Sequence, residues 1–394
     1  MREFDYIVVG GGAAGDAATR GIREHDTNGS IAMISAEDSP PYMKGPMVKN
    51  IMLQELDSIW FHTRERGVEL FSSRLVTDII PHEHLVTDAI GMGYKYGKLI
   101  LALGSKPREI PGDPEIILQY WTLEDYQTLM KLTQSVHDFL IIGGGIIAQE
   151  LVAQLVSLNL HVTSVFQEKH PCQDMFPRTI ARQLMEDMVY HGVNVIPMDK
   201  VTGVRKHDDR VITEFLGSQD LTTGAVISIA GATPNLDLAF NAGIAVKEGI
   251  IVNSHMETSQ PDIFAAGSNV IIEDDAYMGA SNRFFCQDHA TSTGMIAGIN
   301  ATGEGASYDH FPRYGGSFFD KPFHVIGHID AKLDYVIDWG DDEEKAIVYY
   351  VQCGKIEGIL FWNTPPRFDQ ADELIRQNEI FSSQNVLGRI RFKD

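Results

Sequence analysis

The pattern of apolar and polar positions divides the chain into segments of two kinds. The opening run "DYIVV" leads directly into glycines and then into a helix of small residues, the pattern of a buried parallel strand followed by a helix. A second apolar run, "FLII", precedes another glycine cluster. After about residue 308 the pattern changes to strand-like runs such as "FHVIGHI" and "AIVYYVQ", with turns between them and one helix, "RFDQADELIRQ". The chain therefore predicts two α/β segments and a C-terminal α+β block with an antiparallel sheet.

The first glycine loop lies in "DYIVVGGGAAGDAATRGI". Gly10 permits a tight turn, Gly12 lets a pyrophosphate approach the backbone, and Gly15 lets the helix and the strand pack closely. The helix that follows offers free N–H groups and the positive end of its dipole to phosphates. The next strand, "SIAMISAE", ends at Glu37, which is placed to accept hydrogen bonds from an adenosine ribose. This context predicts a dinucleotide site.

The second glycine loop lies in "HDFLIIGGGIIAQELVAQL" and repeats the arrangement. Gly143 and Gly145 take the first two positions, and Ala148 takes the third, which is an allowed variant. The position expected for the acid is Phe166, and the nearest carboxylate, Glu168, comes two residues later. A packed α/β turn without a ligand is the alternative interpretation of this loop.

Two dinucleotide loops in one chain indicate one flavin dinucleotide and one nicotinamide dinucleotide, with electrons passing between them. They also indicate a duplicated nucleotide fold. Glu168 favours NADH, because a carboxylate there repels a 2′-phosphate. Lys169 and Arg178 lie close to Glu168 in the sequence and leave NADPH open as an alternative.

The composition narrows the possible partners and the compartment. The 394 residues carry 32 Lys and Arg against 54 Asp and Glu, a formal net charge of −22. A surface this acidic repels phosphate backbones and anionic lipid, so we expect no nucleic-acid and no membrane partner. We find no apolar run of membrane-spanning length and no targeting segment before the first strand, so the expected location is the cytoplasm.

Cysteine and histidine spacing argues against two kinds of chemistry. Cys172, Cys286 and Cys353 are far apart, whereas a redox-active dithiol needs two thiols within bonding reach. We therefore expect reduced and mostly buried thiols. The fourteen histidines show no metal-ligand spacing, so we expect no metal.

Several motifs together resemble those of one flavoprotein group. They are "PPYMKGPMVK", "GGGIIAQE", "FQEKHP", "DHATSTGMIAGINATG" and "GILFWN". With the two glycine loops, they make the chain similar to the FAD/NAD(P)-dependent pyridine-nucleotide oxidoreductases that bind two dinucleotides. Within that superfamily the chain most resembles apoptosis-inducing factor and the ferredoxin and rubredoxin reductases. The likeness spans nearly the whole chain.

The resemblance implies an α/β fold with two Rossmann-like dinucleotide-binding domains and a C-terminal α+β domain. The implied FAD-binding domain comprises residues 1–111 and 236–307, with the NAD-binding domain, 112–235, inserted between them. Residues 308–394 form the implied interface domain. In this group the reduced complex is linked to dimerisation, so a homodimer is one expectation.

The resemblance also implies roles for individual residues. Lys49 matches a lysine beside flavin N5, and Glu150 matches the acid that pairs with it. An ammonium there stabilises the anionic reduced flavin, and the carboxylate keeps the lysine charged and oriented. The expected FAD contacts are Gly10, Gly12, Ala13, Ala14, Gly15, Glu37, Lys44, Lys49, Val76, Ala102, Gly104, Trp121, Gly267 and Ser268. The expected NAD(H) contacts are Gly143, Gly145, Ile146, Ile147, Glu168 and Gly231.

Three of these residues depart from the group's pattern. Ser268 replaces an aspartate that would accept a hydrogen bond from the ribityl chain, and a hydroxyl makes a weaker bond. Lys44 replaces an arginine and loses its planar fork. Trp121 stands where an arginine commonly contacts the flavin. Together they predict a looser flavin that is retained, with loss of FAD as the alternative.

The resulting hypothesis is an FAD-dependent NADH oxidoreductase without a redox-active disulfide. Its electrons would pass to rubredoxin, ferredoxin, a quinone or oxygen. One alternative is a dedicated rubredoxin or ferredoxin reductase, which should carry a basic docking patch. The other is a non-catalytic redox sensor or scaffold that binds nucleotide and changes its oligomeric state.

Overall fold

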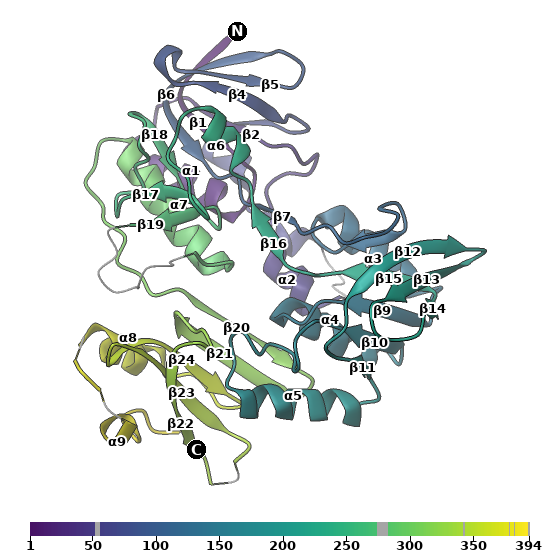
Figure 1. Cartoon of the computed structure of the whole chain (residues 1–394). Helices are drawn as coiled ribbons and strands as arrows, with labels where there is room; N and C mark the ends of the chain where they lie inside the picture. Colours follow the sequence, from purple (N-terminus) through teal and green to yellow (C-terminus); the bar gives the residue numbers. More distant parts are fainter. Residues whose placement is uncertain (52–55, 274–282, 342, 378, 382, 393–394) are drawn as a thin grey trace. The chain divides into compact units, whose positions relative to one another are not determined.

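The computed structural model describes residues 1–394 apart from 52–55, 274–282, 342, 378, 382 and 393–394 (Figure 1). The chain forms two compact units, each assembled from separate stretches of sequence. The first unit comprises Met1–Met43, Glu55–Lys106 and Pro234–Tyr314. The second comprises Lys44–Gln54, Pro107–Thr233 and Gly315–Asp394. The short strands β7 (Ser105–Pro107) and β16 (Ala232–Pro234) lie where the chain passes between units.

The first unit is built on a seven-stranded sheet in the order β3-β2-β1-β6-β5-β4, with β18 paired to β6. Strands β3, β2, β1, β6 and β18 are parallel, whereas β5 and β4 are antiparallel to their neighbours. The parallel strands are apolar and almost wholly buried where they converge, as expected for a sheet covered on both faces. Their bounds are β1 (Arg2–Val9), β2 (Ile31–Ile34), β3 (Val68–Phe71), β4 (Val76–Ile80), β5 (Leu85–Asp88), β6 (Gly93–Leu101) and β18 (Ile263–Ala265).

Two helices of the first unit, α1 (Ala13–His25) and α7 (Gln287–Ala301), pack with their backbones in close approach (Figure 1). A Cβ atom on Gly294 would lie 2.2 Å from the Ala14 carbonyl oxygen, and one on Gly298 would lie 2.1 Å from that of Ala18. The small residues of both helices are therefore a packing requirement. The unit is completed by η1 (Leu56–Ile59), η2 (Thr63–Arg66), η3 (Pro81–Glu83), α6 (Asp237–Asn241), β17 (Ile250–Val252) and β19 (Val270–Ile272).

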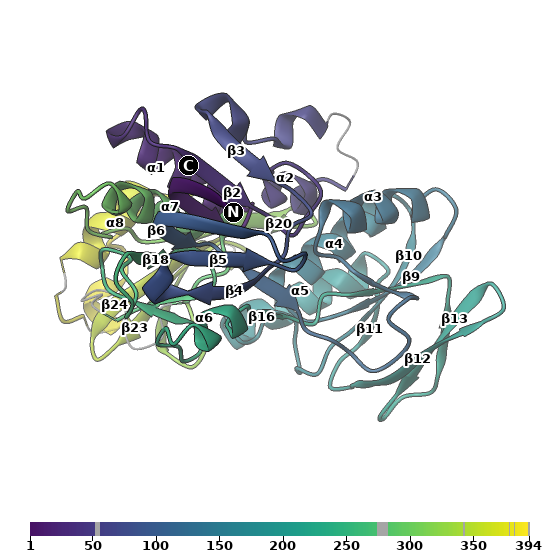
Figure 2. The same ribbon diagram turned by 90° about the horizontal axis from the view of Figure 1, so that it is seen from above.

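The second unit holds a five-stranded parallel sheet in the order β11-β10-β9-β15-β8. Figure 2 shows β9, β10 and β11 of this sheet. A three-stranded antiparallel sheet, β12-β13-β14, is attached to this fold. The strands are β8 (Ile117–Gln119), β9 (Asp138–Ile142), β10 (His161–Val165), β11 (Asn194–Ile196), β12 (Val201–His207), β13 (Arg210–Phe215), β14 (Leu221–Thr223) and β15 (Ala225–Ser228). The helices are α2 (Lys44–Lys49), α3 (Leu123–Leu132), α4 (Ile146–Ser157) and α5 (Arg178–Tyr190).

The C-terminal part of the second unit is a sheet in the order β20-β21-β24-β23-β22, in which β21, β24, β23 and β22 pair antiparallel. Helix α8 packs on β24 and β21. Phe176, which precedes α5, meets Phe318 and Trp362 edge-on, with ring centroids 6.2 and 5.8 Å apart. The elements are β20 (Arg313–Phe318), β21 (Lys321–Gly327), β22 (Asp334–Trp339), β23 (Ala346–Gln352), β24 (Lys355–Trp362), α8 (Phe368–Arg376) and α9 (Ser383–Val386).

The predicted fold class, two Rossmann-like α/β folds with a C-terminal α+β block, is confirmed. No helix in the described part of the chain has the length and apolar character needed to cross a membrane.

Candidate functional site

The first glycine loop joins β1 to α1, and each of its glycines has a different neighbour. Gly10 has φ +119°, and a Cβ atom there would lie 2.0 Å from the Ala102 carbonyl oxygen. A Cβ atom on Gly15 would lie 2.1 Å from the Gly10 carbonyl oxygen. A Cβ atom on Gly12 would meet nothing within 4 Å. The first and third glycines are thus required by packing, and the middle one borders open space at the N-terminus of α1.

Helix α1 leaves its first backbone N–H groups available at this open position. Its N-cap is Gly12, which has no side chain to bond them, and the first N–H inside the helix to find a helical partner is that of Asp16. Ala13 and Ala14 supply the intervening turn, where Ala14 is buried. A phosphate fits here because the N–H groups and the helix dipole both favour an anion.

Glu37 follows β2 and is held in place by a tyrosine. The Tyr42 hydroxyl donates to Glu37 Oε2 at 2.6 Å, and Tyr42 in turn packs edge-on against Trp60. The Ser73 N–H donates to the Glu37 carbonyl at 3.1 Å, so the segment leading to Val76 runs beside Glu37. Val76 itself is buried at the start of β4. The structure therefore brings Glu37 and the segment before Val76 to the same edge of the unit.

The opposite side of the first loop is formed by the chain after β6 and after β18. The Ala102 N–H donates to the Val9 carbonyl at 2.9 Å, and Gly104 turns the chain with φ +60°. Gly267, with φ +99°, packs against α1, since a Cβ there would be 3.1 Å from that of Ala14. The next hydroxyl, that of Ser268, lies 3.1 Å from the Ser105 hydroxyl.

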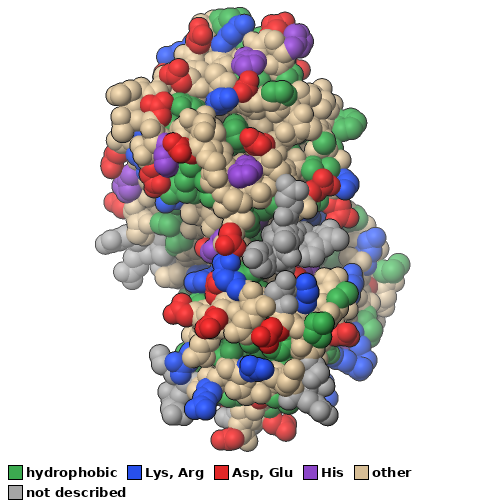
Figure 3. Space-filling model, turned by 90° about the vertical axis from the view of Figure 1, so that its left-hand side faces the viewer, with side chains coloured by type: hydrophobic (Ala, Val, Ile, Leu, Met, Phe, Trp, Pro, Cys, Tyr) green, Lys and Arg blue, Asp and Glu red, His purple; other side chains and the backbone are tan. Residues whose placement is uncertain are grey.

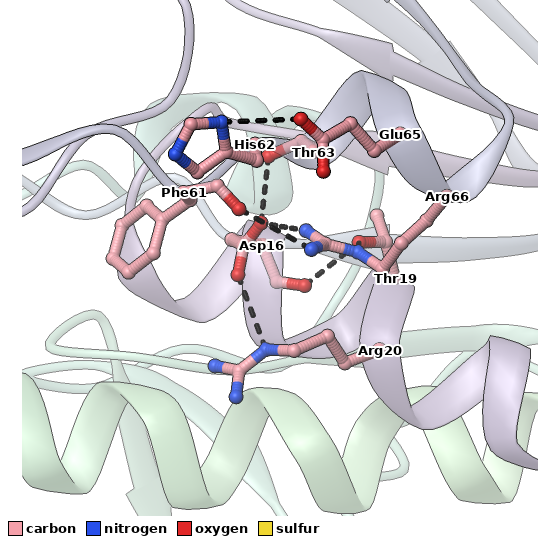
Figure 4. Close-up of polar contacts among 8 residues, drawn as sticks. All are labelled: Asp16, Thr19, Arg20, Phe61, His62, Thr63, Glu65 and Arg66. Carbon is pink, nitrogen blue, oxygen red and sulfur yellow. Dashed lines mark hydrogen bonds and ion pairs between the residues drawn. The ribbon is translucent and has the colours of Figure 1, made fainter. Parts of the chain in front are cut away.

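A buried carboxylate, Asp16, follows the first loop directly and lies in a polar cluster (Figure 4). Arg66 forms an ion pair with it, and the Thr63 hydroxyl donates to it at 2.6 Å. Arg20 completes the cluster with Nε 3.2 Å from Asp16 Oδ2. The cluster ties the first turn of α1 to η2. The sequence offered one signal for it, a charged residue within a helix start made otherwise of small residues.

The second glycine loop joins β9 to α4 with the same division of roles. A Cβ atom on Gly143, which has φ +141°, would lie 2.2 Å from the Ile229 carbonyl oxygen, whereas one on Gly145 would meet nothing within 4 Å. Gly145 is the N-cap of α4 and offers no side-chain cap. Ile146 and Ile147 form the first turn, and Ile147 is 39% exposed.

Gly231, with φ +102°, follows β15 on the other side of the second loop. Its carbonyl accepts the Arg108 N–H at 2.9 Å, and a Cβ on Gly231 would lie 3.7 Å from the Arg108 guanidinium carbon. No local sequence signal pointed to Arg108, because it lies 123 positions before Gly231 in the chain.

The acid of the second loop is in the same register as that of the first. The Gly10 N–H donates to the Ile34 carbonyl, three residues before Glu37, and the Gly143 N–H donates to the Val165 carbonyl, three residues before Glu168. The expectation that Glu168 comes two residues late is therefore wrong, because Phe166 corresponds to Ser35 and not to Glu37. A Cβ on Gly144 would lie 2.7 Å from Glu168 Oε2, so the carboxylate lies against the loop.

Lys44 and Trp121 contact each other in the second unit. Lys44 Nζ donates to the Trp121 carbonyl at 3.0 Å and lies 5.1 Å from the ring centroid, within the range of a cation–π interaction. Trp121 precedes α3, whose start is fixed by a capping box between Thr122 and Asp125. The two departures from the family pattern thus form one structural element.

Glu150 of α4 is buried against β20. A Cβ on Gly316 would overlap Glu150 Oε1, at 1.8 Å, and the Ser317 N–H donates to the carboxylate. Burial raises the pKa of Glu150 to about 7, although the positive charge of Lys49 and the Ser317 hydrogen bond both oppose the shift. Lys49 ends α2 and acts on Glu150 through its charge. The expected pair is therefore close enough to interact, and β20 supplies the contact that positions the acid.

The three cysteines are free thiols in the structure. Cys172 is buried beside the second loop, and its N–H donates to the Gly144 carbonyl at 2.7 Å. Cys286 is half-buried and Cys353 is exposed. Among the described residues, no group of histidines, cysteines and carboxylates could hold a metal ion.

Both loops fit a dinucleotide. In each, a glycine without neighbours stands at an uncapped helix N-terminus, and a carboxylate follows the adjacent strand at the position that contacts a ribose. The residues of the first unit would hold one dinucleotide, and those of the second loop would hold another.

Comparisons with known proteins identify the family. Residues 4–283 match the model of the pyridine nucleotide-disulphide oxidoreductase family. The chain is 27% identical to the 5,5′-dehydrodivanillate O-demethylase ferredoxin reductase subunit of a Sphingobium species, over 95% of this chain and 94% of that protein. It is 24% identical to mitochondrial apoptosis-inducing factor 1 of Dictyostelium discoideum, over 98% of this chain and 81% of that protein.

Solved structures show the same fold. The putidaredoxin reductase–putidaredoxin complex matches with a TM-score of 0.89 and 22% identity, covering 96% of this chain and 94% of that chain. NADH:rubredoxin oxidoreductase from Clostridium acetobutylicum matches with a TM-score of 0.77 and 23% identity, covering 98% and 99%. The chain belongs to the pyridine nucleotide-disulphide oxidoreductase family, and it is an oxidoreductase that uses FAD and NAD(H).

Proposed function

We propose that the chain delivers electrons from NADH to a small iron–sulfur protein of the ferredoxin or rubredoxin class. The observation that carries this proposal is the presence of two complete dinucleotide loops in one chain, with a buried acid beside Lys49. FAD, when bound, accepts a hydride from NADH and releases electrons to the acceptor. The names of relatives support the acceptor class, since the Sphingobium relative is a ferredoxin reductase subunit and one similar solved structure is an NADH:rubredoxin oxidoreductase.

Lys49 and Glu150 would tune this reaction. A Lys49 ammonium next to the flavin would stabilise negative charge that develops on it. Glu150 sets the electrostatic environment of Lys49, and β20 keeps the carboxylate in place through Ser317. Both residues position and stabilise charge, and neither is required to form a covalent bond.

The first unit would hold FAD and the second loop NAD(H). In this assignment residues 1–111 and 236–307 form the FAD-binding domain, 112–235 the NAD-binding domain and 308–394 the interface domain. The boundaries of the compact units at Lys106, Thr233 and Tyr314 lie close to these limits and support the assignment. Residues 44–54, which include Lys49, belong to the second compact unit.

The absorption spectrum and an anaerobic NADH titration test the proposal. The purified chain should show flavin bands that NADH bleaches. Replacing Lys49 by Met should keep the bands and slow the bleaching by about tenfold, a loss of about 1.4 kcal/mol of transition-state stabilisation. Lys131→Met, a change of the same kind on α3, should bleach at the original rate. A chain that cannot be loaded with FAD would overturn the proposal.

The net charge of the chain predicts how ionic strength affects electron transfer to the carrier. On the face drawn in Figure 3, acidic and basic side chains are interspersed, and the net charge is −22. An acidic carrier would therefore be repelled at long range, and salt would screen this repulsion. Reduction of added ferredoxin or rubredoxin should become faster as ionic strength rises. A rate that falls with salt would indicate a local basic docking patch.

A second candidate function is that of a redox sensor. It is favoured by Ser268 and by the Lys44–Trp121 element, whose departures from the group's pattern predict weaker contacts with the flavin. In that case NADH would change the oligomeric state, for example to a homodimer. Size-exclusion chromatography with and without NADH separates the two, because an unchanged elution volume with full turnover rejects the sensor. A cytoplasmic location is part of the proposal and is supported by the three free thiols.

A further inference from the structure

Strand β20 carries two consecutive glycines, Gly315 and Gly316, and each of them borders a titratable side chain. A Cβ atom on Gly316 would overlap the Glu150 carboxylate. One on Gly315 would lie 2.7 Å from His324 Nδ1 and 2.5 Å from the Phe323 carbonyl oxygen. Neither glycine has a positive φ, so close approach, and not backbone conformation, requires them. Because successive residues of a strand face opposite sides of a sheet, Glu150 and His324 lie against opposite sides of β20.

His324 is more accessible to solvent than Glu150. It lies on β21, where its Cα partner is Phe361 of β24, and its ring meets that of Phe368 edge-on at 6.2 Å. These two neighbours are aromatic and carry no charge. The imidazole is half-buried, whereas Glu150 is only 6% exposed. A proton from solvent therefore reaches His324 more readily than Glu150.

The Lys49 ammonium links these two side chains electrostatically. Burial lowers the pKa of His324, and the positive charge of Lys49 lowers it further. The same charge opposes the rise that burial causes in the pKa of Glu150. Arg367 and Asp369 lie at the start of α8, but among the described residues the charge that shifts the pKa of His324 is that of Lys49. His324 is therefore a neutral imidazole near pH 7.

The other groups around Glu150 do not titrate near neutral pH. Ser317 contributes a backbone N–H to the carboxylate. The Cys172 thiol is fully buried, and burial together with the charge of Glu150 holds its pKa well above the ordinary value. The groups of this cluster that can bind a proton between about pH 5 and pH 8 are therefore Glu150 and His324.

We infer that His324 is a positioning residue of the hydride transfer, which binds a proton from solvent when negative charge arrives beside Lys49. The inference rests on the proposed function, because it takes the flavin to lie beside Lys49. NADH gives up a hydride, which is a proton with two electrons, and becomes NAD+. The negative charge that this brings offsets the field of Lys49, so one solvent proton binds at His324. That proton and the proton of the hydride return to solvent when the two electrons pass, one each, to two carrier molecules.

Linkage between proton binding and flavin reduction tests the inference. The measured quantity is the equilibrium constant for bleaching of the flavin by NADH without oxygen, from about pH 5.5 to pH 8. Hydride transfer alone takes no proton from solvent and leaves this constant independent of pH. Each proton taken up makes the constant fall about tenfold for every pH unit, by linkage.

Glu150 and His324 should take up protons in different pH ranges. The pKa of His324 lies below its ordinary 6.5 before reduction and should rise when Lys49 is offset, so its uptake is expected at about pH 5.5 to 6.5. Glu150, with a pKa of about 7, should act at about pH 7 to 8. His324→Gln should therefore remove a fall of about threefold, or about half a proton, in the acid range and leave the neutral range unchanged.

Two further variants separate this role from a general effect of charge or packing. His207→Gln removes an exposed imidazole from the end of β12 and should change neither range. Glu150→Gln should flatten the neutral range and leave the acid range as it was. A role of His324 in packing alone would shift the constant equally at every pH and would overturn the inference.

Two measurements do not depend on a folded His324 variant. A pH indicator in weakly buffered solution at about pH 6 should report proton uptake when NADH bleaches the unaltered chain. NMR of the imidazole without NADH should show that Lys49→Met raises the pKa of His324 toward 6.5. Absence of proton uptake, or an unchanged pKa in Lys49→Met, would overturn the inference.

The same data distinguish failure of the inference from failure of the proposed function. If NADH bleaches the flavin and the acid range is the same in His324→Gln as in the unaltered chain, only the role of His324 is rejected. If NADH does not bleach the flavin at any pH, the proposed function fails, and the inference that rests on it fails as well.

Discussion

The two glycine loops of this chain are built on the same plan, one in each compact unit. In both, the first glycine packs against a carbonyl oxygen of the neighbouring strand, that of Ala102 in one and Ile229 in the other. In both, the second glycine borders open space. Two residues after the facing carbonyl, a left-handed glycine turns the chain, Gly104 in the first unit and Gly231 in the second. The positions expected to meet a ligand are thus the same in the two loops.

The loops differ where they meet the rest of the protein. Gly15 packs on the Gly10 carbonyl at a distance that excludes a side chain, whereas the equivalent Ala148 is accommodated and buried. Helix α1 lies against another backbone through small residues, and α4 instead carries large apolar side chains. The third position of the motif therefore depends on helix packing, the first depends on packing against the neighbouring strand, and the second borders the open space where a ligand is expected.

The residue after the third position is polar and buried in both loops. Asp16 is charged. It forms an ion pair with Arg66 and accepts a hydrogen bond from the Thr63 hydroxyl, and both partners belong to η2. Gln149 is neutral and donates to the Gly143 carbonyl of its own loop at 3.0 Å. The first loop is consequently anchored to a distant segment, and the second is anchored to itself.

The largest expected effect comes from the first glycines. Gly10→Ala and Gly143→Ala each place a Cβ within about 2 Å of a backbone oxygen at a positive φ, so each should cost about 4 kcal/mol of unfolding free energy. Gly10→Ala should lose bound flavin, and Gly143→Ala should keep the flavin and lose bleaching by NADH. Absorption spectra and urea unfolding measure both effects.

Gly91 provides the control for this pair. It has φ +80° with no atom within 4 Å of a Cβ position, so Gly91→Ala should cost only about 1 kcal/mol, the strain of a left-handed backbone. Loss of flavin from Gly143→Ala as complete as from Gly10→Ala would contradict the division of roles between the loops.

The next effect concerns the acid Glu150 of α4. Its pKa in the folded chain, about 7, lies above its ordinary 4.5, so the folded state holds the proton more tightly. Its contribution to stability is full below pH 4.5 and declines as pH rises to 7, by about 3 kcal/mol. Glu150→Gln removes this titration, so the variant should gain in stability relative to the original chain between pH 5 and pH 7.5.

Urea unfolding of both proteins at the two pH values measures the difference, in which the other titrating groups cancel. Glu124→Gln, an exposed acid of α3, serves as the control and should show no such trend. A stability difference between Glu150→Gln and the original chain that does not change with pH would mean that the carboxylate ionises in the folded chain as it does in water.

A smaller effect separates the two buried polar residues. Asp16→Ala leaves the partly buried Arg66 without its ion-pair partner and should cost about 3 kcal/mol. Gln149→Ala removes one neutral hydrogen bond and should cost about 1 kcal/mol. Thermal unfolding of each variant measures these costs, and equal losses would show that the Asp16 cluster of Figure 4 adds nothing beyond a neutral bond.

The smallest effect is expected at the cysteine beside the second loop. Cys172 contacts the loop through its backbone N–H, and alanine keeps this hydrogen bond. Cys172→Ala should therefore cost only about 1 kcal/mol, mainly because the buried sulfur is lost. Burial raises the pKa of the Cys172 thiol, and Glu150 and Glu168 raise it further. A thiol reagent should react first with Cys353, slowly with Cys286, and with Cys172 only after unfolding. Rapid reaction at Cys172 would mean that the second loop opens.

Local features of the fold were predictable from the sequence. Apolar runs followed by spaced glycines predicted both strand–turn–helix units, because a tight turn and an open helix N-terminus depend on neighbouring residues alone. The alternating runs after residue 308 likewise predicted the antiparallel sheet. The family resemblance rested on motifs of the same local kind.

The tertiary structure decided what depends on contacts between distant residues. The register of Glu168 required knowing that the Val165 carbonyl receives the Gly143 N–H. The anchoring of Asp16 by Arg66, and the burial of Glu150 against Gly316, join residues far apart in the chain. Sequence spacing determines which residues can turn, cap or alternate, whereas packing alone determines which charges are buried together and how their pKa values and stabilities respond.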